Sequence, residues 1–367
     1  MPKTGIAILP LHYGRAPKWL FSRMAALSRE IVFSLVTEFG PAELLKRLSD
    51  PYWFQALGCV LGFDWHSSGL TTTVTGALKE GIRGVENELG IFMAGGKGLT
   101  SRKTPEQILS YADKYSINHS PLIYASRMSA KVDNTALQDG YQLYHHAFIF
   151  TYKGDWAVIQ QGMNPVNKTA RRYHWLGEDV KDFVREPHKA ICCDTKQRTL
   201  NMVALESEDA RKISVALSKE NPDRVIKEVE SICELPLPKR HNVTWADVDP
   251  KRLYRILTKT YERQPEDFEK LLGIEGVGPK TIRALSLVSE LIYGKPPSYR
   301  DPARFSFAHG GKDGTPFPVD RNTYDKTIDV IKNAIQSAKV GNTDKMEAIK
   351  RLNKSRTFSM VHLERKI

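Results

Sequence analysis

Apolar residues recur at intervals of three and four along several separate stretches, and this spacing predicts helices. From about residue 209 onward the pattern is almost wholly helical, whereas the first 200 residues mix helical spacing with β-prone runs. A short apolar run at Gly5–Leu9 predicts one strand. The helices are expected at residues 16–27, 28–39, 71–89, 250–260, 267–272, 281–293 and 322–338.

Residues 144–163, YHHAFIFTYKGDWAVIQQGM, follow a different pattern. Two β-prone runs flank the turn sequence KGD, which predicts a β-hairpin. In such a hairpin His145 or His146 lies within a residue or two of Gln160 or Gln161. Strand alternation puts the two histidines on opposite faces. We expect only one of these faces to be buried, so that one histidine reaches a polar site.

These elements predict an α+β fold with two domains. We expect a mixed α/β domain with an antiparallel β-hairpin at residues 1–200, an all-helical domain at residues 201–340 and a basic arm at residues 341–367. A proline-broken connector, ELPLPKRHNVTW, lies within the helical half. Residues 294–318 are rich in Gly and Pro and too long for a routine connection, and loops of that length are often functional.

The charge of the chain narrows the choice of partners. The 367 residues hold 54 Lys and Arg against 42 Asp and Glu, a net charge of +12, which favours polyanions such as DNA. No apolar run approaches the roughly 18 residues of a membrane-spanning helix, and the N-terminus lacks a secretory signal. The four cysteines show no zinc-type spacing. We expect a reduced, cytoplasmic protein with no membrane partner. The oligomeric state, a homodimer included, is left open.

The stretch Leu271–Leu285, LLGIEGVGPKTIRAL, joins two predicted helices through a glycine turn. Glycines on either side of Val277 permit a tight turn, and Pro279 suits the first turn of the second helix. Several amide N–H groups are left unpaired where that helix begins, and such groups bind anions.

This stretch resembles the helix-hairpin-helix of DNA repair proteins, over about residues 267–292. In that family the turn presents backbone N–H groups to a DNA phosphate without regard to sequence. The resemblance implies five DNA-binding residues here: Gly276, Val277, Gly278, Lys280 and Thr281. A structural alternative stays open, in which the glycines only end one helix and begin another.

A second resemblance concerns Lys280 and Asp320. Glycosylases related to endonuclease III carry a Schiff-base lysine at the position of Lys280 and an aspartate downstream, which FPVD at residues 317–320 resembles. The separation here is wider than in that family, and no iron–sulfur cysteine set follows. Glycosylase or AP lyase chemistry is therefore the alternative function.

Over most of residues 1–340 the chain also resembles a bacterial and archaeal family known as domain of unknown function 763. The resemblance lies in LPLHYGRAPKWL, GFDWHSSG and the HHAF…WAVIQQGMN hairpin. It implies an α/β domain followed by a helix-hairpin-helix, and it implies no activity.

Polar residues around the predicted β-hairpin indicate a second site. Carboxylate, imidazole and amide groups around Mg²⁺ or Mn²⁺ can activate water for phosphodiester hydrolysis. Asp133, Asp139 and His146 are the candidate metal ligands, and Gln160 and Lys131 complete the candidate catalytic set. The alternative is that these groups are structural.

Three further motifs contain residues that could bind a ligand. Asp64 and His66 form another candidate pair, and His12 with Arg15 could bind phosphate or form a structural turn. GIFMAGGKG lacks the spacing of a nucleotide-binding loop.

Taken together, these patterns predict a DNA-processing protein of repair or recombination type. The leading hypothesis is a metal-dependent, structure-specific endonuclease that acts on DNA with a bubble, branch or lesion. A glycosylase/lyase and a non-enzymatic DNA-binding scaffold are the alternatives.

Overall fold

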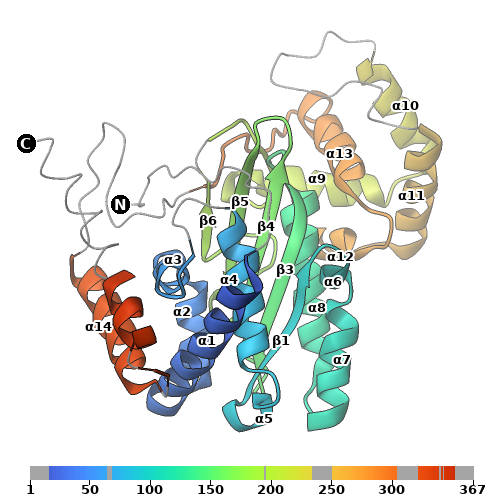
Figure 1. The fold of residues 1–367 in the computed structure, drawn as a ribbon. Coiled ribbons are helices and arrows are strands. Elements are labelled where there is room, and N and C mark those ends of the chain that lie inside the picture. The colour runs from blue at the N-terminus through green and yellow to red at the C-terminus, as the bar shows by residue number, and fades with distance from the viewer. Residues whose placement is uncertain are drawn as a thin grey trace, which may run out of the picture.

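The computed structural model describes residues 16–63, 68–193, 196–233, 250–303, 321–338, 340–341 and 343–351 (Figure 1). The N-terminal part holds four long helices and a short one, followed by an edge strand. These are α1 (Lys18–Phe39), α2 (Pro41–Ser49), α3 (Pro51–Val60), α4 (Gly69–Gly81), α5 (Glu86–Leu89) and β1 (Ile91–Lys97).

The middle of the chain supplies the rest of the sheet and the helices that cover one face of it. These are α6 (Leu99–Arg102), α7 (Thr104–Tyr115), α8 (His119–Lys131), a π-helical turn (Val132–Ala136), β2 (Leu137–Gln138), β3 (Gln142–Thr151), β4 (Trp156–Asn164), β5 (Thr169–Leu176), β6 (Ala190–Cys192) and β7 (Leu200–Asn201). Helices α9 (Glu208–Ser218), α10 (Pro222–Cys233), α11 (Pro250–Arg263), α12 (Phe268–Gly273), α13 (Pro279–Leu291) and α14 (Arg321–Ser337) follow.

Five strands form one antiparallel sheet in the order β1-β3-β4-β5-β6, and β2 pairs with β7 separately. The central hairpin is present, with His146 opposite Gln160 and His145 opposite Gln161, within the one or two residues expected from the sequence. The β1 glycines do not form a loop. At Gly95, where φ is +86°, an added Cβ would lie 2.1 Å from the His146 carbonyl oxygen, so only glycine fits.

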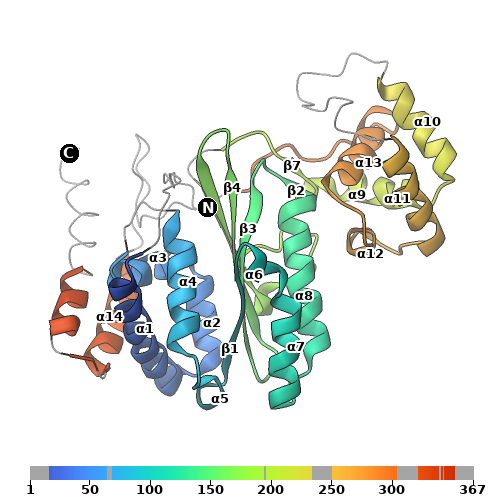
Figure 2. The ribbon, with the colours of Figure 1, turned by 45° about the vertical axis from the view of Figure 1, so that its right-hand side comes forward.

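Helices cover both faces of the sheet, as Figure 2 shows with the sheet seen on edge. Phe148 and Phe150 belong to a hydrophobic cluster with α7, α8 and the C-terminal helices. Ile149 and Ile159 belong to a second cluster with α1 to α4. The expectation that one face of the hairpin is exposed was therefore wrong, because both faces carry apolar residues that pack on helices.

The C-terminal helices share a core with the sheet. Leu253, Leu271 and Ile282 lie in the same buried cluster as Phe148 of β3. Helix α14 instead packs on α1, on the other side of the sheet (Figure 1). No helix among the described residues is long and apolar enough to cross a bilayer.

Most predicted helices are present, with shifted ends. The two helices expected at 16–39 are one helix, α1, and the segment expected at 71–89 is divided into α4 and α5. The strand expected at Gly5–Leu9, much of the loop at 294–318 and most of the basic arm lie outside the described residues. The same holds for His12, Arg15, Asp64, His66 and Asp320.

Candidate functional site

Helices α12 and α13 are joined by a five-residue turn, residues 274–278. The Asp267 side chain caps α12 by accepting a hydrogen bond from the Lys270 amide at 2.7 Å. The Val277 amide donates to the Ile274 carbonyl at 3.2 Å and closes the turn. Gly276 has a φ of +96°, a left-handed conformation that favours glycine. Pro279 then begins α13.

The turn leaves several backbone amides unpaired. Among the described residues, the amide N–H groups of Gly276, Gly278, Lys280 and Thr281 have no hydrogen-bond partner, and no side chain caps α13. Gly276 and Lys280 are exposed. Val277 and Thr281 are buried at 1% and 3% exposure, so these two side chains anchor the turn. We refer to residues 274–281 as the glycine turn.

The glycine turn is held in place from the N-terminal half of the chain. Lys131 donates from Nζ to the Val277 carbonyl at 2.6 Å. Gln138 donates to the Pro279 carbonyl at 2.8 Å and accepts from Arg283. Burial lowers the pKa of Lys131, and the Glu275 carboxylate opposes that shift. The structure thus places Lys131 at the turn, away from the candidate catalytic residues that sequence reasoning grouped it with.

Cations of α11 flank the same turn. Lys259 forms an ion pair with the exposed Glu275 at 3.0 Å, and Arg263 also lowers the pKa of that carboxyl group. A Cβ added at Gly276 would lie 3.7 Å from Ile256, which places α11 directly beside the glycines. Arg255 is exposed one residue earlier.

Three of the predicted catalytic residues meet in a buried hydrogen-bonded chain. His146 accepts from the Ser126 hydroxyl at 2.9 Å and donates from Nδ1 to Gln160 Oε1 at 2.8 Å. Gln160 donates from Nε2 to Asp133 Oδ2 at 2.5 Å. Burial lowers the pKa of His146, and the Gln160 hydrogen bond opposes this shift. The pair of hydrogen bonds, one accepted and one donated, suits the neutral imidazole.

Asp133 also bonds to His188, a residue that the sequence analysis did not single out. Its carboxylate accepts from Trp175 Nε1 at 2.9 Å and from His188 Nε2. The His188 ring packs on Trp175, with centroids 4.5 Å apart. The backbone on either side is fixed, because Glu186 N donates to Val203 O at 2.8 Å and Lys189 N donates to His174 O at 2.9 Å. Glu186 has a left-handed φ of +48°.

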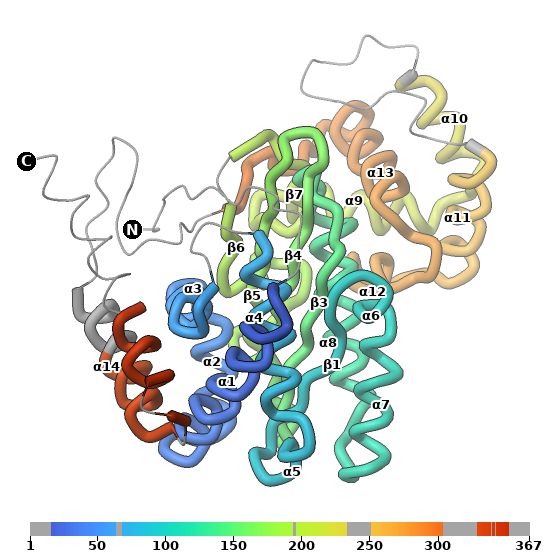
Figure 3. The backbone as a smooth tube through the Cα atoms, in the orientation of Figure 1, coloured from blue at the N-terminus to red at the C-terminus, as the bar shows by residue number. Residues whose placement is uncertain are grey.

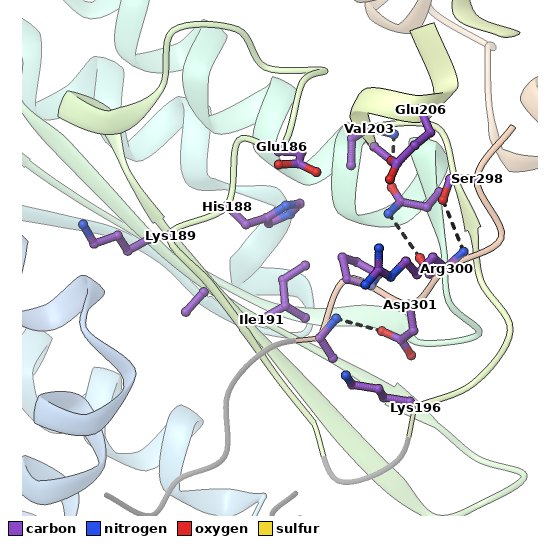
Figure 4. A pocket seen from close by; sticks show the side chains of 15 residues that line it. Glu186, His188, Lys189, Ile191, Lys196, Val203, Glu206, Ser298, Arg300 and Asp301 are labelled. Atoms are coloured by element: carbon purple, nitrogen blue, oxygen red, sulfur yellow. Dashed lines mark hydrogen bonds between the residues drawn. The ribbon is translucent and has the colours of Figure 1, made fainter. Parts of the chain in front are cut away.

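His188 lines a pocket with a volume of about 320 Å³ at the β6 edge of the sheet. Glu186 and His188 enter it from one side, and Ser298, Arg300 and Asp301 lie on the other (Figure 4). Nε2 of His188 donates to a carboxylate, which can only accept. In the neutral form of the ring Nδ1 then carries the lone pair, and it has no hydrogen-bond partner among the described residues.

Asp139 belongs to a different cluster. It accepts from Arg171 at 2.8 Å, from the Tyr173 hydroxyl at 2.7 Å and from the Tyr141 amide at 3.1 Å. Arg171 also forms an ion pair with Asp301 at 2.7 Å, and Asp301 lines the pocket. Burial raises the pKa of Asp139, and Arg171 opposes this shift. Asp139 and Asp133 thus have separate partners.

The three residues expected to bind a metal do not offer free ligands. Protein donors occupy both oxygens of Asp133 and both oxygens of Asp139, and both ring nitrogens of His146 are bonded. Within the described ranges, no three His, Cys, Asp or Glu side chains are arranged to hold a metal ion. A metal requirement therefore stays a hypothesis, with no ligand set assigned.

Three buried histidines make stability depend on pH. Burial lowers the pKa of His145 to about 3, lowers that of His146, and lowers that of His174 well below its usual value. The unfolded chain binds more protons below pH 6.5, so stability falls as pH drops below that value. Below pH 6.5, each of these histidines lowers the free energy of unfolding by about 1.4 kcal/mol per pH unit, until the pH reaches the pKa of that histidine in the folded protein.

We therefore expect the free energy of unfolding, measured in urea, to fall steeply between pH 6.5 and pH 5. His145→Gln should reduce this slope, because the variant removes one of the neutral buried imidazoles. A stability that is flat over this range would contradict the burial of these rings.

Sequence reasoning missed His188, Arg171 and Asp301. His188 lies 55 residues from Asp133 in sequence. Its segment, REPHKA, has no periodic pattern, and only the folded sheet brings the two together. The one signal was composition, because KTARRYHW interleaves aromatic residues with two adjacent arginines.

The chain belongs to the family described as Protein of unknown function (DUF763), whose model matches residues 5–319. Comparisons with curated proteins and with solved structures find no significant match.

Proposed function

We propose that this protein binds DNA through its sugar–phosphate backbone at the glycine turn, and that it processes the DNA held there. One observation carries the proposal. The unpaired amides of Gly276, Gly278 and Lys280 lie at the start of α13, a helix of 13 residues. Amides at a helix N-terminus bind phosphate, and they do so without reading the bases.

The surrounding charge supports the same proposal. Lys280 is exposed beside the amides, and α11 presents Arg255, Lys259 and Arg263 next to the turn. The net charge of +12 provides a long-range attraction for a polyanion. The links from Lys131 and Gln138 hold the turn to α8 and β2, so the amides are pre-arranged for a ligand.

The first test is the salt dependence of DNA binding, measured by fluorescence anisotropy with labelled duplex and bubble DNA. The slope of log K against log salt is about −0.9 for each phosphate that the protein neutralises. Lys280→Ala should make the slope shallower by about one and weaken binding to all sequences alike. Lys103→Ala, which removes an exposed lysine between α6 and α7, is the matched control and should leave the slope unchanged. A wild-type affinity that does not change with salt would rule out the proposal.

A second variant should change affinity in the opposite direction. Glu275 is fully exposed at the turn and holds Lys259 in an ion pair. Glu275→Gln removes a charge that repels phosphate and releases Lys259 to bind one. We expect tighter binding and a salt slope steeper by about one. Weaker binding by this variant would show that phosphate does not approach the turn.

The reaction on the bound DNA is proposed to be phosphodiester hydrolysis on duplexes with a bubble, branch or lesion. A dependence on Mg²⁺ or Mn²⁺ is tested by cleavage with and without EDTA. The lyase alternative is tested in the same assay by borohydride trapping on abasic DNA. Lys280 lies among the phosphate-binding amides, which favours a backbone contact over a Schiff base.

A further inference from the structure

We infer that the pocket at the β6 edge is a hydrolytic site, in which His188 is the general base that activates water against a DNA phosphodiester. This inference rests on the proposed DNA binding, and it replaces the catalytic residues expected from the sequence with a different histidine. It depends on three features: the Asp133–His188 pair, the pocket in front of it, and the position of the pocket relative to the glycine turn.

The Asp133–His188 pair has the arrangement that a general base requires. Asp133 is fully buried and accepts hydrogen bonds from Gln160, Trp175 and His188. The bond to Nε2 sets the tautomer of the neutral His188 ring and leaves the Nδ1 lone pair without a protein partner, in a side chain that lines the pocket. The side chain of His188 is 6% exposed, so it is shielded from bulk solvent yet lines the pocket.

The network behind the pair holds it rigid. Successive hydrogen bonds join Ser126 to His146, His146 to Gln160 and Gln160 to Asp133. Both ring nitrogens of His146 and both side-chain polar atoms of Gln160 take part in these bonds. His146 and Gln160 are thus positioning residues. They orient Asp133, which in turn orients His188.

The pocket wall opposite His188 carries cations that can contact a phosphodiester, and the carboxylates of Glu206 and Asp301 line it as well. Arg300 lies across from His188, and Lys196 lies at the lower side of the pocket (Figure 4). Each can stabilise the charge that develops on the non-bridging oxygens of a phosphate under attack. Asp301 is already bonded to Arg171 and to the amides of Gln197 and Ala303, so it acts as part of the wall.

The reaction balances with water alone. The water oxygen forms a bond to phosphorus while its proton moves to His188 Nδ1, and the bond from phosphorus to one ester oxygen breaks. The leaving oxygen takes a proton from solvent, and His188 returns its proton to solvent. The products are a phosphomonoester end and a hydroxyl end.

The position of the pocket fits a substrate held at the glycine turn. The turn lies at the start of α13, and Ser298, Arg300 and Asp301 follow the end of that helix. The chain after α13 returns to β7, where Asn201 N donates to Ser298 O at 2.9 Å (Figure 3). Thirteen helical residues span about 20 Å, so one bound DNA molecule can reach both places.

The test measures cleavage and binding on the same samples of the full chain. Labelled duplex, bubble and abasic DNA are incubated with wild type, His188→Ala and His188→Gln, in Mg²⁺, in Mn²⁺ and in EDTA. We expect both variants to keep wild-type affinity and to cleave about 10²- to 10⁴-fold more slowly. Glutamine retains a hydrogen bond to Asp133, so it covers the case in which alanine fails to fold. His119→Ala, a histidine at the start of α8, is the matched control and should cleave like wild type.

Added imidazole should partly restore cleavage by His188→Ala, because it supplies the missing base, whereas a purely structural role would show no rescue. Cleavage by the variants at the wild-type rate, or an absence of rescue, would overturn the inference. DNA that is bound but not cut by wild type under any condition would overturn it too, and would leave the DNA-binding proposal standing. No binding by wild type would remove both.

Discussion

Gly278→Val is expected to weaken DNA binding by at least tenfold without unfolding the protein. Gly278 has an extended backbone, with φ of −135°, which any residue adopts, and an added Cβ would meet only the Gly276 carbonyl oxygen, at 3.8 Å. The fold therefore tolerates a side chain. That side chain would stand beside the unpaired amides and keep a phosphate away from them. Charge-assisted hydrogen bonds contribute about 1.5–3 kcal/mol each, so losing one already costs a factor of ten or more.

Gly276→Ala should act by a different route. With φ of +96°, alanine here strains the turn and shifts the amides. Gly294→Ala is the matched control, because Gly294 also has a positive φ, of +66°, has open space around it and lies past the far end of α13. Anisotropy titrations measure affinity, and thermal unfolding reports the fold. Unchanged affinity for both glycine-turn variants would show that DNA does not approach these amides.

Asp139→Ala is expected to lower the free energy of unfolding by about 3–5 kcal/mol, because it leaves a buried arginine without one of its two carboxylate partners. Arg171 and Asp139 have side chains that are 0% and 1% exposed. The variant also removes the acceptor of the Tyr173 hydroxyl. Urea unfolding at pH 7.5 measures the change.

The double variant Asp139→Leu with Arg171→Met is the informative comparison. Replacing a buried ion pair by apolar residues of similar size is often neutral, so this protein should be more stable than the single variant. A cost below about 1 kcal/mol for Asp139→Ala would contradict the buried ion pair. A stable Asp139→Asn variant that loses only cleavage would restore the catalytic role expected from the sequence.

The sequence predicted the central hairpin well because its information is local. The turn KGD and the alternation around it limit the register, so the two histidines were correctly placed within a residue or two of Gln160 and Gln161. The same alternation assigned His145 and His146 to opposite faces. Its error was to leave one face exposed. Helices α1 to α4 cover that face. Because His and Gln interrupt the apolar positions of the strands, the sequence pattern does not predict that helices pack there.

The candidate site was predicted in part. Asp133, His146 and Gln160 do meet, because the end of α8 runs alongside β3 and β4. Lys131 is only two residues from Asp133, yet it bonds to the Val277 carbonyl. The π-helical turn at Val132–Ala136 begins between the two side chains. Spacing along a chain cannot reveal such a local change of helix geometry, which often marks a functional position.

The amino-acid sequence by itself determined where α1, α4, α11, α12, α13, α14 and the hairpin lie, the basic charge, and the glycine turn, because periodicity, turn residues and composition act over short distances. Only the tertiary structure decided which polar groups face one another. His188 reaches Asp133 across 55 residues, Arg171 joins Asp139 to Asp301, and Lys131 supports a turn 146 residues away. These pairings arise because buried polar groups must find hydrogen-bond partners once the apolar faces have packed, and partners from distant segments become available only in the folded chain.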